Sequence, residues 1–240
     1  MNGQVFVVTG GGGALAGSVA RVFHAAGARL VLVDGRAEPL LTRARGLGAL
    51  PIVADLGQWR EAERVVGETL QAFGRLDGLV HTVGAFATAP AAANDEALYR
   101  RLLDANLGTT VAMVQACLPH FLGRRQGFIA AVASQVAWQG GAAPGMSLYA
   151  AAKAALAAFL RSVEREVAGA GVRVAIVYPM AAIDTEANRA AMPEADPGGW
   201  VDPEEIAQAL LFAAGRSHRG VLLALPVGVV AAAGEDGGGR

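Results

Sequence analysis

The 240-residue sequence has one cysteine, Cys117, and one lysine, Lys153. A single cysteine excludes an intrachain disulfide and any zinc site built from several cysteines, and it favours a reducing compartment. The four histidines show no metal-ligand spacing, so no metal is expected. Since almost every basic residue is an arginine, the lone Lys153 points to a task unsuited to a guanidinium, with chance retention as the alternative.

An excess of charge of one sign is also missing, since the formal net charge is −1. Nucleic acids and anionic membranes are bound by clustered Lys and Arg, so neither is an expected partner. The apolar run at residues 221–233 is broken by Pro226 and Gly228 and is shorter than the ~20 residues of a membrane span. Residues 4–9 lack the basic n-region of a secretory signal. We expect a cytoplasmic protein that acts on small molecules.

The hydrophobic residues, 53% of the sequence, follow an alternation of strand and helix patterns. Runs typical of buried strands occupy residues 4–9, 29–34, 50–54, 76–83, 128–133, 172–178 and 221–225, and helical spacing occupies residues 14–26, 38–47, 59–73, 98–122, 148–167 and 204–214. Such an alternation predicts an α/β fold with a doubly wound parallel sheet. We expect one domain over residues 1–230, a substrate lid at residues 183–200, and a flexible tail at residues 231–240.

A glycine-rich turn at residues 10–13 lies between the first strand and the first helix. In this position backbone amides and the helix N-terminus can approach a pyrophosphate, and a flexible turn is the alternative. Asp34 ends the second strand, where a carboxylate binds ribose hydroxyls and repels a 2′-phosphate. NAD is therefore expected in preference to NADP. Arg36 leaves this preference open, because it could pair with Asp34 or bind a phosphate, and Asp34 could also be a surface turn acid.

Tyr149 and Lys153 are four residues apart on a predicted helix, so their side chains lie on one face. A nearby ammonium favours a phenolate and lowers the pKa of a phenol from its reference value of ~10. The pair therefore predicts an acid–base site.

These motifs resemble those of the short-chain dehydrogenase/reductase family over essentially the whole chain. The family's TGxxxGxG signature matches at Thr9 and Gly10, whereas Ala14 and Ala16 replace the later glycines. The resemblance implies a catalytic set in which Tyr149 protonates a carbonyl oxygen, Lys153 activates it and binds the nicotinamide ribose, Ser134 orients the substrate, and Asn106 holds a relay water. Ser147 is the rival of Ser134, whose loop to Tyr149 is longer than usual, and a solvent-facing helix position is the alternative for Asn106.

The same resemblance implies a set of cofactor-binding residues, namely Gly10, Gly13, Leu15, Asp34, Asp55, Leu56, Gly84, Lys153 and Pro179. Asp55 could instead be the N-cap of the next helix. Val83 and Met180 depart from the Asn-Ala-Gly and Pro-Gly patterns of the family. The residues Trp138, Met146, Met180, Met192 and Trp200 are expected either to roof the cleft with apolar surface or to pack in the core.

The sequence thus predicts an NAD(P)-dependent oxidoreductase that moves a hydride between nicotinamide and a carbonyl or secondary alcohol substrate. The alternative is an inactive dinucleotide sensor or scaffold of the same fold. An epimerase or dehydratase with the same Tyr-Lys pair would need a longer chain. A homotetramer is expected, because the helices predicted at residues 98–122 and 148–167 are rich in alanine and can pack closely across subunits.

Overall fold

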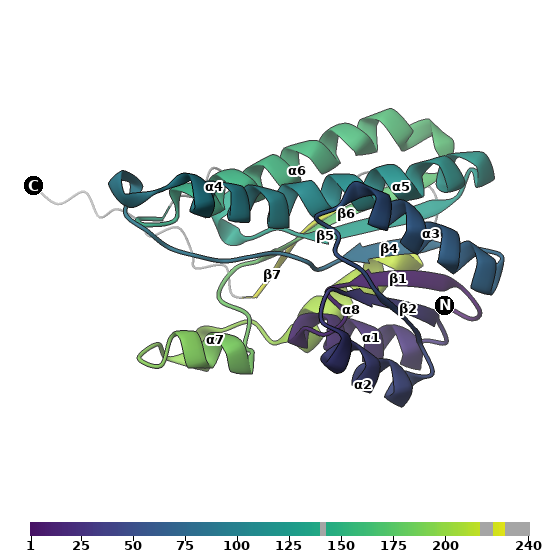
Figure 1. The fold of residues 1–240 in the computed structure, drawn as a ribbon, viewed down its shortest axis with the longest axis horizontal. Coiled ribbons are helices and arrows are strands. Elements are labelled where there is room, and N and C mark those ends of the chain that lie inside the picture. The colour runs from purple at the N-terminus through teal and green to yellow at the C-terminus, as the bar shows by residue number, and fades with distance from the viewer. Residues whose placement is uncertain (140–142, 217–222, 229–240) are drawn as a thin grey trace, which may run out of the picture.

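Within residues 1–139, 143–216 and 223–228, which the computed structural model describes, seven strands form one parallel sheet in the order β3-β2-β1-β4-β5-β6-β7 (Figure 1). The strands are β1 (Val5–Thr9), β2 (Arg29–Asp34), β3 (Leu50–Val53), β4 (Gly78–His81), β5 (Gly127–Val132), β6 (Val172–Pro179) and β7 (Leu223–Val227). The order reverses between β1 and β4, and ligands bind at such a switch point, beyond the carboxyl ends of the strands. The predicted doubly wound fold is confirmed as a single Rossmann-like domain.

Helices cover both faces of the sheet (Figure 1). One layer contains α1 (Ala14–Ala25), α2 (Ala37–Leu47) and α8 (Pro203–Gly215), and the other contains α3 (Trp59–Phe73), α4 (Glu96–Leu103), α5 (Thr109–Arg124) and α6 (Ser147–Val167). Successive side chains of β1 point to opposite faces of the sheet, and both faces are buried. Val5 and Val7 lie in one hydrophobic cluster and Phe6 and Val8 in the other, which explains why this strand is apolar throughout. The predicted tail at residues 231–240 lies outside the described residues.

The long helix predicted at residues 98–122 is present, but α4 and α5 are joined within it by a π-helical segment, Asp104–Gly108, which the sequence did not predict. Hydrogen bonds of a π-helix run to the fifth residue back, which disturbs the pairing of carbonyls four residues back. Here side chains bind such carbonyls: Asn106 Nδ2 donates to the oxygen of Leu102, and the hydroxyl of Thr110 donates to that of Asn106. The π-helical segment thus depends on polar side chains inside a helix.

Residues 183–200, expected as an irregular lid, contain a short helix, α7 (Glu186–Ala191), set apart from the sheet (Figure 1). The two ends of the segment are joined, since Ile183 and Val201 form a parallel bridge and the amide of Asp184 donates to the Val201 carbonyl at 2.8 Å. The segment is therefore a closed loop on the α/β core. Among the described residues, no helix combines the length and apolar character needed to cross a bilayer.

Candidate active site

Two adjoining cavities lie beyond the carboxyl ends of β1, β2, β4 and β5. The larger, of about 660 Å³, is lined by Gly10, Gly13, Asp34, Asp55 and Leu56. The smaller, of about 290 Å³, is lined by Ser134, Asn106, Tyr149, Lys153 and Pro179. Leu15 and Gly84 line both, so the two cavities form one cleft that contains all the residues predicted for the site.

The glycine turn begins at Gly10, whose φ of 71° favours glycine and where a Cβ would lie 2.9 Å from Thr82 Oγ1. Gly13 is the N-cap of α1. Glycine has no side chain that could accept a hydrogen bond from the first amides of the helix, and these residues line the larger cavity. Ala14 and Ala16 lie in the first turn of α1, where the backbone is helical. Alanine fits these two positions, because neither requires a positive φ.

Arg43, on α2, lines neither cavity but holds the glycine turn, a contact that sequence reasoning missed. Its Nη1 donates to the carbonyls of Gly11, at 2.6 Å, and Gly13. Gly17 in α1 leaves room for the guanidinium, since a Cβ at this position would lie 2.8 Å from Arg43 Cζ. In the sequence, the one signal of this contact was a glycine, Gly17, in the interior of a predicted helix.

Asp34 is only 9% exposed, so the surface-acid alternative is wrong. Its Oδ2 accepts from the Gly12 amide at 2.9 Å, and its Oδ1 accepts from the amide and Nε of Arg36 at 2.9 and 3.3 Å. Of the roles left open for Arg36, the structure shows the ion pair with Asp34. The carboxylate thus fixes the glycine turn as well as facing the larger cavity.

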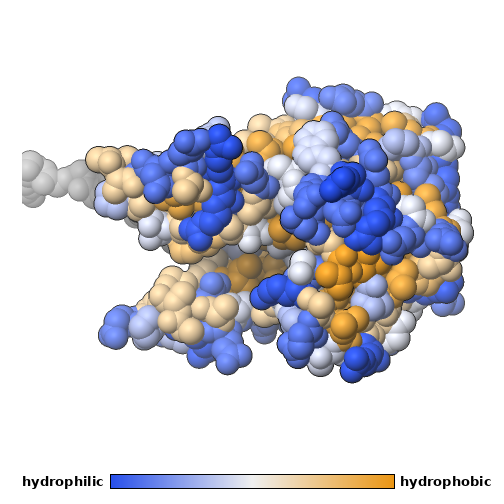
Figure 2. All heavy atoms as spheres, viewed as in Figure 1, coloured by the Kyte–Doolittle hydropathy of each residue, from blue (hydrophilic) through white to orange (hydrophobic). Residues whose placement is uncertain are grey.

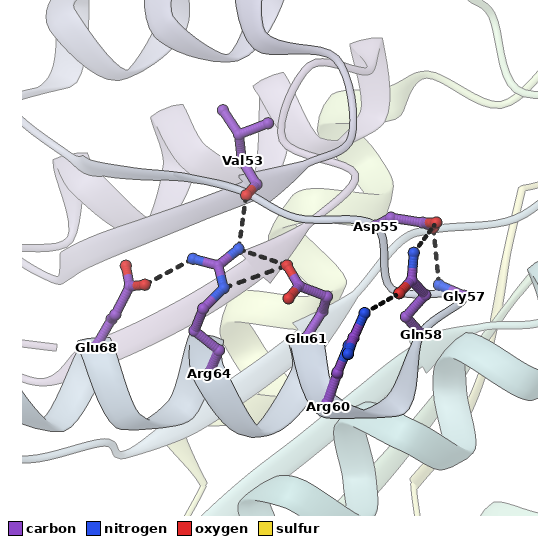
Figure 3. Close-up of polar contacts among 8 residues, drawn as sticks. All are labelled: Val53, Asp55, Gly57, Gln58, Arg60, Glu61, Arg64 and Glu68. Carbon is purple, nitrogen blue, oxygen red and sulfur yellow. Dashed lines mark hydrogen bonds and ion pairs between the residues drawn. The ribbon is translucent and has the colours of Figure 1, made fainter.

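Asp55 makes a turn rather than a helix cap (Figure 3). Its Oδ1 accepts from the Gly57 amide at 3.0 Å, whereas the N-cap of α3 is Gln58. Nearby, Arg64 donates to the Val53 carbonyl at 2.8 Å and pairs with Glu61 and Glu68, which secures the end of β3 (Figure 3). The N-cap alternative for Asp55 is therefore wrong.

Tyr149 and Lys153 project from α6 into the smaller cavity. The Tyr149 ring meets Phe86 edge-on, with centroids 5.0 Å apart, and Lys153 Nζ donates to the Val132 carbonyl at 2.8 Å. Burial lowers the pKa of Lys153 to about 8. Burial also raises the pKa of Tyr149, although a hydrogen bond with Ser134 acts in the opposite direction. The expectation of a lowered phenol pKa is wrong for this state of the protein, because desolvation dominates.

Ser134 follows β5 and lies beside Tyr149 in the smaller cavity. The rival Ser147 is exposed, and its hydroxyl accepts from Asn94 Nδ2 at 3.0 Å. The structure therefore brings Ser134, not Ser147, to the phenol. Residues 140–142 of the longer loop lie outside the described part of the chain.

Asn106 is fully buried, so the solvent-facing alternative is wrong. Its Nδ2 donates to the carbonyls of Ala85 and Leu102, both at 2.9 Å, and its Oδ1 has no hydrogen-bond partner among the described residues. A Cβ at Gly84 would lie 2.7 Å from this oxygen and 3.2 Å from Lys153 Nζ. Glycine at position 84 thus keeps space between the amide oxygen and the ammonium.

His81, the last residue of β4, is buried, with 1% of its surface exposed. Its Nδ1 is 2.9 Å from Thr9 Oγ1, and its Nε2 is 3.1 Å from Thr109 Oγ1. The Thr109 hydroxyl donates to the Ala105 carbonyl, so it accepts from Nε2–H, and Nδ1 accepts from Thr9. Burial lowers the pKa of His81 to about 3. A neutral histidine therefore joins the last residue of β1 to the first residue of α5.

The apolar residues expected near the cleft divide into two groups. Met146 and Met192 line the smaller cavity. Trp138 packs against Tyr178, with ring centroids 4.9 Å apart, and Met180 packs against the core cluster beneath α6. Trp200 does not line either cavity. No cluster of His, Cys, Asp and Glu suited to a metal ion occurs in the described ranges.

Comparison with known proteins links this cleft to a family. A family model described as short chain dehydrogenase matches residues 4–196. Dehydrogenase/reductase SDR family member 7B of Bos taurus is 30% identical, with 93% of this chain and 74% of that protein covered. The (2S)-[(R)-hydroxy(phenyl)methyl]succinyl-CoA dehydrogenase subunit BbsD of Thauera aromatica is 31% identical, with coverage of 88% and 89%. The solved structure of levodione reductase shares the fold, with a TM-score of 0.84 at 23% identity over 95% of this chain and 97% of that one.

Proposed function

This chain belongs to the short-chain dehydrogenase family, and on that premise we propose that Tyr149 exchanges a proton with the oxygen of a carbonyl or secondary alcohol substrate during NAD-linked hydride transfer. The chain is an oxidoreductase of the short-chain dehydrogenase/reductase type, a family that uses NAD(P) and acts on small molecules. One observation carries the proposal. The smaller cavity, which adjoins the larger cavity at the glycine turn, is lined by all four proposed catalytic residues, Tyr149, Ser134, Lys153 and Asn106.

The residues of the cleft fit a dinucleotide. The glycine turn and the uncapped start of α1 suit a pyrophosphate, and Asp34 suits the hydroxyls of a ribose. The other residues proposed to contact the cofactor are Gly10, Gly13, Leu15, Asp55, Leu56, Gly84, Lys153 and Pro179. The nicotinamide, when bound, supplies or accepts the hydride. We propose NAD rather than NADP, because the Asp34 carboxylate would repel a 2′-phosphate.

The proposed roles of the side chains follow from their protonation and contacts. A raised pKa keeps Tyr149 a neutral phenol at neutral pH, which is the form that donates a proton to a carbonyl oxygen during reduction. Ser134 donates a hydrogen bond to the same oxygen. Lys153 stabilises the phenolate that forms, and the free Oδ1 of Asn106 offers an acceptor for a relay water beside the ammonium.

None of the departures from the family pattern favours an inactive sensor or scaffold. Ala14 and Ala16 are helical, Met180 does not line the smaller cavity, and Val83 packs against the core while Gly84 keeps its place. The proposal is tested by screening ketones and secondary alcohols with NADH, NADPH and their oxidised forms, and following the absorbance of reduced nicotinamide. Dinucleotide binding without turnover across a broad panel would favour the inactive alternative.

The proposal includes a cytoplasmic homotetramer. On α6, the exposed Ala151, Ala154 and Ala158 share one side of the helix and offer a close-packing surface to another subunit. The single cysteine, Cys117, is buried and suits a reducing compartment. Light scattering at micromolar concentration measures the assembly, and a monomer would contradict it.

A further inference from the structure

The smaller cavity has almost no charge in its walls. The apolar side chains that line it include Phe86, Val136, Met146, Ile183 and Met192. Among the described residues that line it, the ionisable side chains are Tyr149 and Lys153 alone, and the proposed chemistry uses both. Figure 2 shows a hollow between α7 and the layer above it, with hydrophobic surface at its floor. A charged substrate group would find no ionic partner of its own here.

The charges of the lid segment do not supply such a partner. Asp184 and Arg189 form a two-bond ion pair, with distances of 2.6 and 2.7 Å, and neither residue lines the cavity. The lid residues that do line it are Ile183, Asn188 and Met192, of which only Asn188 is polar. The Nδ2 of Asn188 donates to the Ile183 carbonyl at 2.8 Å, so its second N–H and its Oδ1 are left for hydrogen bonds of a neutral group.

Lys153 is also poorly placed to bind an acidic substituent. It is 6% exposed, and its ammonium donates to the Val132 carbonyl on the strand side of the cavity. Burial favours the uncharged amine, which lowers the pKa of Lys153 to about 8. A carboxylate brought into the same site would lose its hydration without a compensating ion pair, which is unfavourable.

The size of the cavity limits the substrate further. Its volume of about 290 Å³ lies at the lower end of the ~300–1,000 Å³ typical of pockets for drug-sized ligands. Part of this space adjoins Pro179 and Leu15, where the proposed function puts the nicotinamide. The remainder suits a body of about one ring, placed against Phe86 and the two methionines.

We propose that the substrate is a small, uncharged ketone or secondary alcohol with an apolar body of about one ring, and that carbonyl compounds bearing a carboxylate or phosphate are excluded. This inference rests on the proposed function and defines the substrate class of the same site. Apolar walls disfavour a charged ligand because it would lose its hydration there. We therefore expect the cavity to reject charged substrates and not to require one particular ring.

The experiment compares neutral and acidic forms of the same ketone. Methyl levulinate and levulinate form one pair, and methyl acetylbenzoate and acetylbenzoate form another. Binding to the full chain is measured by saturation-transfer NMR with and without NAD, and turnover by absorbance of reduced nicotinamide. We expect the esters to bind and to react with a kcat/KM at least about a hundredfold above that of the acids. Equal binding of acids and esters, or no binding of any ester, would overturn the inference.

Variants place a charge on the cavity wall or beside it. Met192→Arg should narrow the ester-to-acid ratio by about tenfold or more, because the guanidinium offers the missing partner. Ala191→Arg adds the same charge at an exposed position that does not line the cavity, and should leave the ratio unchanged. Met146→Arg, at the cavity-lining residue just before α6, repeats the test if the first variant unfolds. If Met192→Arg or Met146→Arg folds and its ester-to-acid ratio of kcat/KM equals that of the wild type, the inference is wrong.

The same measurements separate this inference from the proposed function. Undiminished turnover in Tyr149→Phe would overturn the function, whatever ligand the cavity prefers. An inactive Tyr149→Phe together with a wild type that accepts acids as well as esters would leave the function standing and show that the substrate class is wrong.

Discussion

The ammonium nitrogen of Lys153 lies 6.0 Å from the centre of the Tyr149 ring while it donates a hydrogen bond to Val132 at the end of β5. The side chain of Lys153 therefore extends from α6 to the end of β5, and this hydrogen bond fixes the position of the ammonium relative to the phenol of Tyr149. Gly84 bounds the same space on the other side, since a Cβ there would lie 3.2 Å from Nζ. Little room is left for a larger cation.

Lys153→Arg is expected to lower kcat/KM by at least about a hundredfold, because the planar guanidinium is larger and a shift of ~1 Å in a catalytic group can have this effect. Steady-state kinetics on the folded variant provide the measurement. The control is Arg165→Lys, the opposite exchange at an exposed position of the same helix, which should leave kinetics within a few fold. Near-wild-type kinetics in Lys153→Arg would show that the single lysine is an accident.

Tyr149→Phe is expected to lower kcat by about 10²- to 10⁴-fold, the usual contribution of a positioned acid or base. The ring and its contact with Phe86 are retained, so the Kd for the dinucleotide should stay within a few fold. Tyr99→Phe, at a 52% exposed position of α4, is the matched control and should be neutral. Comparable turnover in Tyr149→Phe would remove the assignment of the proton donor.

Asp34→Ala is expected to narrow the preference for NAD over NADP by about tenfold, equivalent to about 1.4 kcal/mol, through loss of repulsion. The carboxylate also binds the amides of Gly12 and Arg36, so the alanine variant could disturb the turn as well. Asp34→Asn keeps an acceptor without the charge and separates these effects. The measurement is the ratio of kcat/KM with NAD to kcat/KM with NADP, in the wild type and in both variants. A wild type that prefers NADP would contradict the role of Asp34.

Arg43→Met is expected to raise the Kd for NAD by about tenfold with a smaller change in kcat, because hydrogen bonds from a charged group contribute roughly 1.5–3 kcal/mol and hold the glycine turn. Gly17→Ala should act in the same direction by displacing the guanidinium. Gly46→Ala is the control: it lies in α2 with open space around it and should stabilise the fold by about 0.5–1 kcal/mol. Titration calorimetry and denaturant unfolding measure both effects, and unchanged affinity in Arg43→Met would refute the role of this residue.

His81 is expected to make the protein sensitive to acid. The pKa of His81 in the fold is about 3, below the ordinary histidine value of 6.5, so between these two pH values the unfolded chain binds a proton that the folded chain does not. The stabilisation is complete above pH 6.5 and is lost as the pH falls toward 3, with about 2 kcal/mol gone by pH 5. Urea unfolding should show this loss in the wild type and in His24→Asn, whose histidine is exposed, and a smaller loss in His81→Asn, where burial still lowers the pKa of His120. Equal pH dependence in all three proteins would contradict the assignment.

The sequence predicted features that depend on neighbouring residues. Tyr149 and Lys153 meet because four residues make about one helical turn, and Asp34 and Ser134 reach the cleft because each follows a buried parallel strand. The strand predicted at residues 76–83 is shorter in the structure. The strand β4 ends at His81, and the last two residues of the predicted strand, Thr82 and Val83, leave the sheet to line the larger cavity.

Contacts between distant segments could not be read from such patterns. Arg43 is 32 residues from Gly11, and His81 is 72 residues from Thr9. The π-helical segment left a weak signal in Asn106, Thr109 and Thr110, polar residues that each bind a carbonyl four positions back. In the sequence Thr109 and Thr110 looked like ordinary helix residues and Asn106 was assigned to a relay water, because spacing alone does not distinguish 3.6 residues per turn from a wider turn.

The single lysine also makes the proposed site chemically addressable. Reagents that acylate or reductively alkylate side-chain amines have only Lys153 to modify, and its pKa of about 8 keeps a larger share of the amine unprotonated at neutral pH than an ordinary lysine has. Its 6% exposure restricts reaction to small reagents that enter the cleft. Mass spectrometry of peptides from the labelled chain, which separates Lys153 from the α-amino group of Met1, therefore reports whether the cleft is occupied, with no mutation and no assay of turnover.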